Sequence, residues 1–146
     1  MSKQRAAAKA KRRLPVPFPI LVLFALVLGA VGYSLFAPRA SAAEHPDPRP
    51  GITAAKVQPP ERYAQDPRVA QVYAEVAQIA SVADGIYCHC DCSRHSGHRS
   101  LLSCFESDHG AGCDICLGEA HLAYTMTRQG ASLEQIRTAI DQQFGA

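Results

Sequence analysis

The stretch Cys88-His89-Cys90-Asp91-Cys92 carries three cysteines at alternate positions, and the interpretation of the whole chain begins from it. All six cysteines lie within 29 consecutive positions, the other three being Cys104, Cys113 and Cys116. Small domains with few residues for a core often depend on disulfides or a bound metal. We therefore expect a fold that has this cysteine-rich loop at its centre.

Cysteines separated by one residue are poor disulfide partners, because a disulfide tolerates only a narrow range of Cα separations and dihedral angles. Each cysteine of the triplet 88–92 is therefore expected to find its partners downstream. Metal binding is one chemistry for such a set, since thiolates are soft ligands that favour Cu(I) and Zn(II). Six thiolates exceed the needs of one tetrahedral ion. The surplus favours a polynuclear Cu(I) cluster, or a site that combines ligands with free thiols.

The leading hypothesis is a site for a soft metal ion, copper before zinc, that stores the ion or hands it to a partner rather than catalysing a reaction. Its predicted ligands are Cys88, Cys90, Cys92, Cys104, Cys113, Cys116 and His89. His89 is included because it lies inside the triplet, although a solvent-facing loop residue is the alternative. The remaining nearby histidines are interpreted as solvated loop or helix-surface residues: His95, His98, His109 and His121.

Two other functions stay open. An even number of cysteines in an oxidising compartment also fits three disulfides, in a domain that serves as an accessory subunit of a membrane complex. A thiol–disulfide redox protein is the third possibility. Cys113 lies at a predicted helix N-terminus, where the helix dipole favours the thiolate form, and Cys116 could act as the resolving cysteine. The Cys-x-x-Cys motif lacks the strand–helix context of thioredoxin-like proteins, so the motif alone is weak support for a redox function. The sequence also contains no nucleophile–base pair or phosphate-binding loop that would indicate a hydrolase or a kinase.

Charge is unevenly distributed along the chain. Residues 1–13 hold six Lys/Arg and no acid, whereas residues 43–146 hold eight Lys/Arg and thirteen Asp/Glu. An acidic domain is a poor nucleic-acid binder, for which a basic face would be expected. We therefore expect no nucleic-acid partner.

The N-terminus predicts export. The basic tail 1–13 should stay in the cytoplasm, and residues 14–38 should form a single transmembrane anchor or a signal sequence. The apolar run 16–37 is about 22 residues, long enough to span a bilayer of roughly 30 Å. Ala40-Ser41-Ala42 is a plausible cleavage site, so a signal peptide is the alternative. Either way the cysteines would lie in the periplasm or outside the cell, where disulfides can persist.

The rest of the chain is expected to hold a Pro-rich linker and one folded domain. Residues 39–60 contain Pro46, Pro48, Pro50, Pro59 and Pro60, which predicts a stiff, extended spacer. Residues 61–146 show apolar residues at three- and four-residue steps and no strand pattern. The expected fold class is a small all-α domain around the cysteine-rich loop.

Capping signals place the helices. Asp66-Pro67 is typical of a helix start, and Gly85 of a helix end. Ser132 and Gln135 are spaced as a capping box. The expected helical segments are 67–84, 100–105, 113–128 ending at Gly130, and 133–144.

The combined pattern resembles a known family. The triplet is followed by Gly97-His98-Arg99-Ser100-Leu101-Leu102-Ser103-Cys104-Phe105 and by Cys113-Asp114-Ile115-Cys116-Leu117-Gly118-Glu119-Ala120. Over residues 84–146 this is similar to the CYCXC, or PCYCGC-motif, family of exported bacterial proteins. The chain departs from the family pattern at Tyr87, usually proline, and at His89, usually tyrosine. Some members carry selenocysteine, which implies that a thiol there does chemistry or binds a soft metal.

Overall fold

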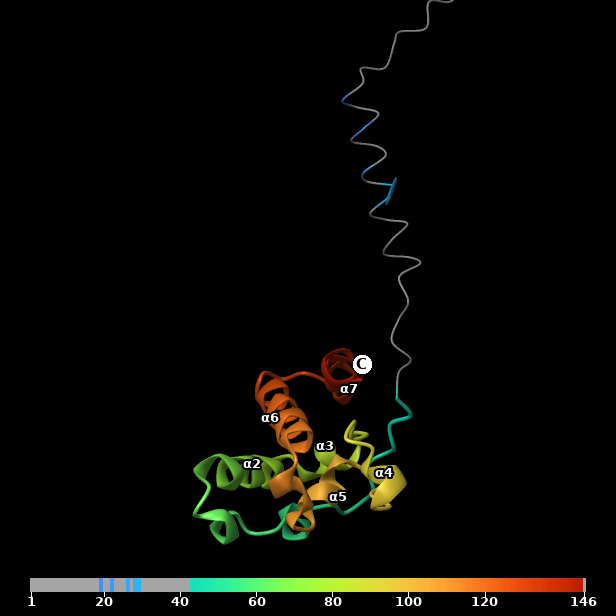
Figure 1. Cartoon of the computed structure of the whole chain (residues 1–146). Helices are drawn as coiled ribbons and strands as arrows, with labels where there is room; N and C mark the ends of the chain where they lie inside the picture. Colours follow the sequence, from blue (N-terminus) through green and yellow to red (C-terminus); the bar gives the residue numbers. More distant parts are fainter. Residues whose placement is uncertain (1–18, 20–21, 23–25, 27, 30–42, 146) are drawn as a thin grey trace, which may run out of the picture. The chain divides into compact units, whose positions relative to one another are not determined.

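The computed structural model describes residues 19, 22, 26, 28–29 and 43–145 (Figure 1). The predicted basic tail 1–13 lies outside these residues, as does most of the predicted membrane segment 14–38. In the part of the chain that the structure describes, no helix combines the length and the apolar composition needed to cross a membrane.

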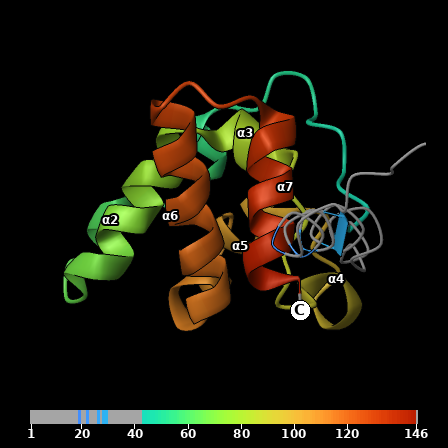
Figure 2. The same ribbon diagram turned by 90° about the horizontal axis from the view of Figure 1, so that it is seen from above.

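Within residues 43–145 every regular element is helical, which confirms the all-α prediction. The elements in chain order are η1 (Ala54–Lys56), η2 (Pro60–Tyr63), α2 (Pro67–Gln78), α3 (Ala80–Asp84), α4 (Cys92–His95), α5 (Leu101–Phe105), η3 (Asp108–Gly112), α6 (Asp114–Arg128) and α7 (Leu133–Phe144). The long helix α6 packs against both α2 and α7, and the shorter elements α3, α5 and η3 also contact it (Figure 2).

Helix α2 begins as predicted but ends early. The Asp66 carboxylate accepts hydrogen bonds from the backbone N–H groups of Arg68 and Val69. The helix was expected to continue to Gly85, but Ile79 has φ −122° and ψ 26°, and α3 starts after it. Ile79 and Ala80 are both buried. The apolar pattern continues across the break, so the sequence could not reveal it.

Helices α6 and α7 match their predicted signals closely. Cys113 is the N-cap of α6 rather than its first residue. Gly130 follows the end of α6 with φ 82°, a left-handed conformation that glycine adopts without strain. The Ser132–Gln135 capping box of α7 is complete in both directions.

The core combines aromatic, aliphatic and thiol side chains. Tyr73 is fully buried, and its ring lies 4.9 Å from that of Phe105, centroid to centroid. The Tyr73 hydroxyl donates to the Ser107 carbonyl at 2.8 Å. Four cysteines belong to the same buried cluster, namely Cys88, Cys92, Cys104 and Cys116. These four cysteine side chains are therefore part of the hydrophobic core.

Residues 45–58, within the predicted Pro-rich linker, lie against the helical domain. The Arg49 guanidinium approaches the Asp84 carboxylate to 2.7 Å, and the Arg49 backbone N–H also donates to Asp84 at 2.7 Å. Val57 is buried, and the Gln58 N–H donates to the Phe105 carbonyl at 2.9 Å. Most of these contacts are made by backbone groups and by isolated polar side chains. Such contacts produce no periodic apolar pattern, so the sequence does not predict them.

Asp84 should make a measurable contribution to stability. Its carboxylate is fully buried and also accepts from the Ser100 hydroxyl at 3.1 Å. We expect Asp84→Asn to lower the free energy of unfolding by about 2 kcal/mol in denaturant titrations, less than for a fully buried pair because Arg49 is partly exposed. The control Glu134→Gln alters an exposed side chain and should change stability by less than about 0.5 kcal/mol.

The contribution of Asp84 to the free energy of unfolding should depend on pH. Burial alone would raise the pKa of Asp84, but the hydrogen bonds from Arg49 and Ser100 outweigh it and lower that pKa below its ordinary value. A lowered folded-state pKa means that the contribution is present above the ordinary Asp pKa and is lost as the pH falls through the folded value. Equal stability of the wild type and Asp84→Asn at neutral pH would contradict this account.

Candidate metal centre

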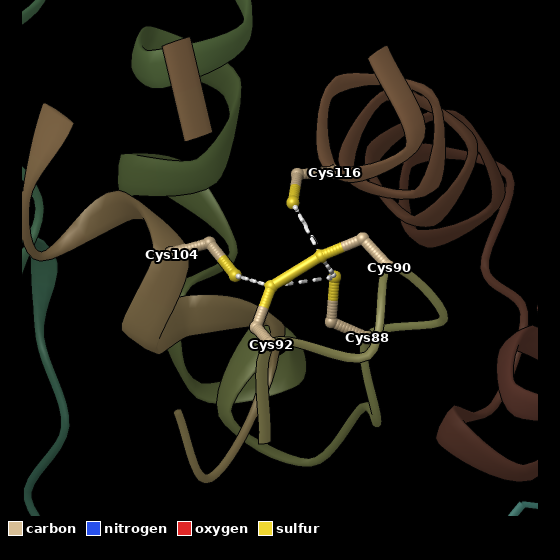
Figure 3. A group of neighbouring side chains, drawn as sticks. All are labelled: Cys88, Cys90, Cys92, Cys104 and Cys116. Carbon is tan, nitrogen blue, oxygen red and sulfur yellow. Dashed lines mark hydrogen bonds between the residues drawn. A yellow bond between two sulfur atoms is a disulfide. The ribbon is translucent and has the colours of Figure 1, made fainter. Parts of the chain in front are cut away.

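Five cysteine sulfurs meet in the core, and we call them the five-sulfur group. Its members are Cys88, Cys90, Cys92, Cys104 and Cys116, whose sulfur atoms all lie within 4.8 Å of one another (Figure 3). Only Cys90 is partly exposed, and the other four are buried. The group joins the loop 88–92 to α5 and α6, so three separate parts of the chain meet at it.

Local backbone structure brings the triplet to the helices. The Leu101 N–H donates to the Ile86 carbonyl at 2.8 Å, which holds the start of the loop against α5. Asp91 has φ 60°, a left-handed conformation, and turns the chain into α4, whose first residue is Cys92. Cys116 reaches the same centre from the first turn of α6.

The spacing of the sulfurs is close to that of a metal–thiolate site. The Cys88, Cys90 and Cys116 sulfurs are 3.4 Å apart in each pairing. The Cys92 and Cys104 sulfurs are 3.5 Å apart. Ligands about 2.3 Å from a tetrahedral zinc ion stand about 3.8 Å from one another. Outward movements of a few tenths of an ångström would therefore admit an ion among the sulfurs.

Cys90 and Cys92 are joined by a disulfide, while Cys88, Cys104, Cys113 and Cys116 are free. This disulfide was not expected, because each cysteine of the triplet 88–92 was predicted to find its partners further along the chain. The turn at Asp91 sets their Cα atoms 5.5 Å apart, within the usual range for disulfides. Reduction of the bond consumes two electrons and two protons, and only the reduced chain offers all five thiols.

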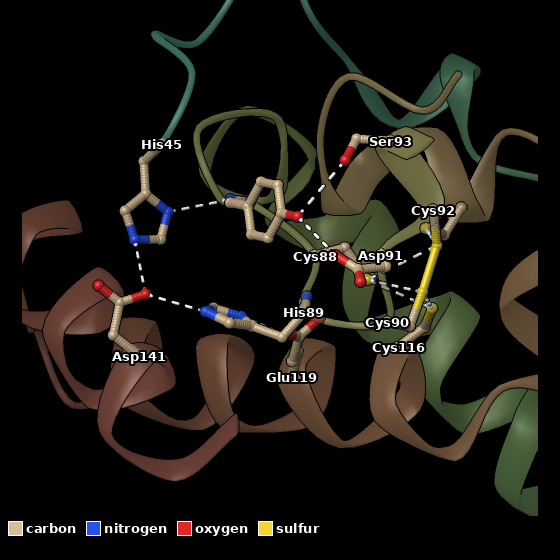
Figure 4. A network of polar contacts seen from close by, with 12 residues as sticks. His45, Cys88, His89, Cys90, Asp91, Cys92, Ser93, Cys116, Glu119 and Asp141 are labelled. Atoms are coloured by element: carbon tan, nitrogen blue, oxygen red, sulfur yellow. Dashed lines mark hydrogen bonds and ion pairs between the residues drawn. A yellow bond between two sulfur atoms is a disulfide. The ribbon is translucent and has the colours of Figure 1, made fainter. Parts of the chain in front are cut away.

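Two predicted ligands lie outside the five-sulfur group. Cys113 caps α6, where its sulfur accepts a hydrogen bond from the Cys116 N–H at 3.4 Å. His89 turns toward carboxylates: its Nδ1 lies 2.7 Å from Glu119 Oε1, and its Nε2 lies 3.1 Å from Asp141 Oδ1 (Figure 4). Both ring nitrogens of His89 are thus within hydrogen-bonding distance of a carboxylate oxygen.

A buried acidic network lies beside the thiols, and no sequence pattern indicates it. Glu119 is fully buried; its Oε1 accepts from the His89 N–H at 2.8 Å, and its Oε2 has no hydrogen-bond partner among the described residues. Burial raises the pKa of Glu119 above its ordinary value. His45, from the predicted linker, lies 3.0 Å from Asp141 and accepts from the Tyr87 N–H at 2.9 Å. Only long-range contacts bring these residues together.

The other histidines divide into two sets. His98 and His109 lie beside the sulfurs, in contrast to their interpretation as solvated loop residues, and they form a second candidate ligand set with Cys92 and Cys104. Burial lowers the pKa of His98, which favours the neutral ring that a metal needs. His121 stays on the helix surface, as expected, with its Nδ1 2.9 Å from Glu75. His95 is exposed.

The environment of the buried free thiols, Cys88, Cys104 and Cys116, keeps them protonated. Contacts with neighbouring sulfurs act in both directions on the pKa of Cys88 and Cys116, and burial then leaves both well above the ordinary thiol value. The negative charge of Glu119 adds to the raised pKa of Cys88. Protonated thiols are weak nucleophiles. A cation among the sulfurs would reverse this balance, because thiolate ligands are stabilised by metal charge.

The fold and this centre define a small cysteine-rich helical protein that could hold a metal ion or form disulfides. The chain belongs to the PCYCGC family: the family model described as "Protein of unknown function with PCYCGC motif" matches residues 21–146. This confirms the resemblance. No curated protein and no solved structure matches the chain.

The motif in the family's description aligns with residues 87–92 and differs at three positions. This chain has Tyr87 for proline, His89 for tyrosine and Asp91 for glycine. Asp91 is the one described non-glycine residue with positive φ. Glycine is the residue that adopts this conformation most readily. The backbone turn thus gives a physical reason for a glycine in the motif.

Proposed function

We propose that the reduced five-sulfur group binds a soft metal ion, Cu(I) in preference to Zn(II), and that the domain stores the ion or passes it to a partner. The observation that carries the proposal is the convergence of five sulfurs within 4.8 Å. Convergent soft donors in a dry core favour Cu(I), which thiolates select.

The arrangement within the group supports Cu(I) in particular. Cys88, Cys90 and Cys116 form a near-equilateral triangle of sulfurs, and three-coordinate thiolate binding suits Cu(I). The buried carboxyl group of Glu119 is close enough to Cys88 to contribute to the raised pKa of that thiol, and its negative charge would favour a cation there. Cys90 is the partly exposed member, so it is the sulfur that a partner could reach first during transfer.

The location of the domain is part of the proposal. The basic residues 1–13 and the apolar run 16–37 support an N-terminal membrane anchor with the domain in the periplasm or outside the cell. A membrane protein complex or a metal-transfer protein would then be the partner.

Thiol–disulfide chemistry is the second candidate, and the Cys90–Cys92 disulfide is the observation that favours it. Its formation releases two protons and two electrons to an acceptor and removes two of the five thiols. The raised pKa values of Cys88 and Cys116 weigh against these thiols as attacking groups.

Removing a ligand should weaken binding, whereas removing Cys113 should not. We expect Cys116→Ser to lower Cu(I) affinity at least about tenfold, or ~1.4 kcal/mol, in competition titrations of reduced protein under anaerobic conditions. Cys113→Ser is a matched control, because a serine hydroxyl also accepts the N-cap hydrogen bond. Equal losses in the two variants would contradict the assignment of ligands.

Metal affinity should rise with pH. Cys88, Cys104 and Cys116 have raised pKa values and hold their protons at neutral pH, so each of these thiols must release a proton when it binds the ion as a thiolate. If two protons leave, the logarithm of the affinity increases by about two per pH unit. Affinities measured from pH 6 to pH 8 test this expectation, and a flat profile would mean that protonated thiols are not the ligands.

A further inference from the structure

We infer that the molecule has a second metal position, formed by Cys92, His98, Cys104 and His109, which takes a borderline divalent cation of the Zn(II) class. We call it the Cys2His2 position. The inference goes beyond the proposed function because it concerns a different ion and different donors, although two of its thiols also belong to the five-sulfur group. Its four candidate ligand atoms lie within 4.8 Å of one another.

The distances fit a tetrahedral ion. His109 Nε2 lies 3.2 Å from the Cys92 sulfur, and His98 Nδ1 lies 3.4 Å from the Cys104 sulfur. Zinc bonds of about 2.3 Å to sulfur and about 2.0 Å to nitrogen give tetrahedral S···N edges of about 3.5 Å. The two observed S···N distances are close to this value, and the separation of 3.5 Å between the two sulfurs is a few tenths of an ångström shorter than the S···S edge of about 3.8 Å.

Four separate pieces of the chain supply the donors. Cys92 begins α4, His98 lies in the loop between α4 and α5, Cys104 lies in α5, and His109 lies in η3. The two imidazole rings meet edge to face, with centroids 4.6 Å apart and planes at 75°. A bound ion would therefore tie α4 and η3 to α5, much as structural zinc sites tie together loops in small domains.

The donor set selects the ion. Two thiolates and two imidazoles in a tetrahedron are typical of zinc, whereas all-sulfur sets favour Cu(I). The thiols of Cys92 and Cys104 are fully buried, while His98 and His109 are partly exposed. A divalent ion that arrives from solvent thus meets the imidazoles before the sulfurs.

The two positions are compatible. When Cys92 and Cys104 hold the divalent ion, Cys88, Cys90 and Cys116 remain as the triangle of sulfurs proposed for Cu(I). Both positions need the reduced chain, because Cys92 cannot bind as a thiolate while it is bonded to Cys90. A dithiol reductant supplies the two electrons, and the cysteines take up two protons.

X-ray absorption at the zinc edge tests the position directly. The full chain, reduced and loaded with one equivalent of Zn(II), should show two sulfur and two nitrogen neighbours. The double variant His98→Ala/His109→Ala should lose the nitrogen neighbours and at least about tenfold in Zn(II) affinity. His95→Ala removes an exposed histidine close by and should behave as the wild type. A four-sulfur shell, no zinc binding, or unchanged affinity in the double variant would overturn the inference.

The test of the Cys2His2 position can be distinguished from the test of Cu(I) binding by the five-sulfur group. Cys88→Ser removes a thiol outside the Cys2His2 position, so it should weaken Cu(I) binding and leave the two-sulfur, two-nitrogen zinc shell intact. Zinc bound in that shell by a wild-type chain that takes no Cu(I) would refute the proposed function alone. Cu(I) bound by a chain that takes no zinc would refute the second position alone.

Discussion

The structure depends on one constraint: the same sulfurs fill the core and form the candidate metal centre. Cys88, Cys92, Cys104 and Cys116 occupy core positions that aliphatic side chains would fill in other small domains. Packing among α5, α6 and the loop 88–92 is therefore inseparable from the chemical state of the thiols. Protonated thiols, a disulfide or a bound ion would each change the contacts between these segments.

Much of the framework could be predicted because its signals are local. The Asp66 cap, the Ser132 capping box and the left-handed Gly130 mark helix ends with residues whose physical roles depend only on their near neighbours. The clustered cysteines likewise predict a shared centre, since a small core has few places to bury them. The break at Ile79 was missed because apolar residues continue on both sides of it.

The residues that complete the site could not be predicted, because long-range packing brings them there. His98 and His109 look like polar loop residues in sequence, yet α5 and η3 set them beside the sulfurs. His45 belongs to a proline-rich segment that anchors to Asp141, 96 positions away. Cys113 shows the converse case: the Cys-x-x-Cys spacing predicts two ligands, and in the structure one of these two cysteines is the N-cap of α6.

The central claim is that the reduced centre is a metal site rather than a set of structural disulfides. Native mass spectrometry of the full chain, prepared without oxygen and offered Cu(I), counts bound metal and disulfides in one measurement. The account predicts a metal-bearing species in which the sulfurs of the five-sulfur group are not oxidised. A chain that carries no metal and has all six cysteines in disulfides would contradict it.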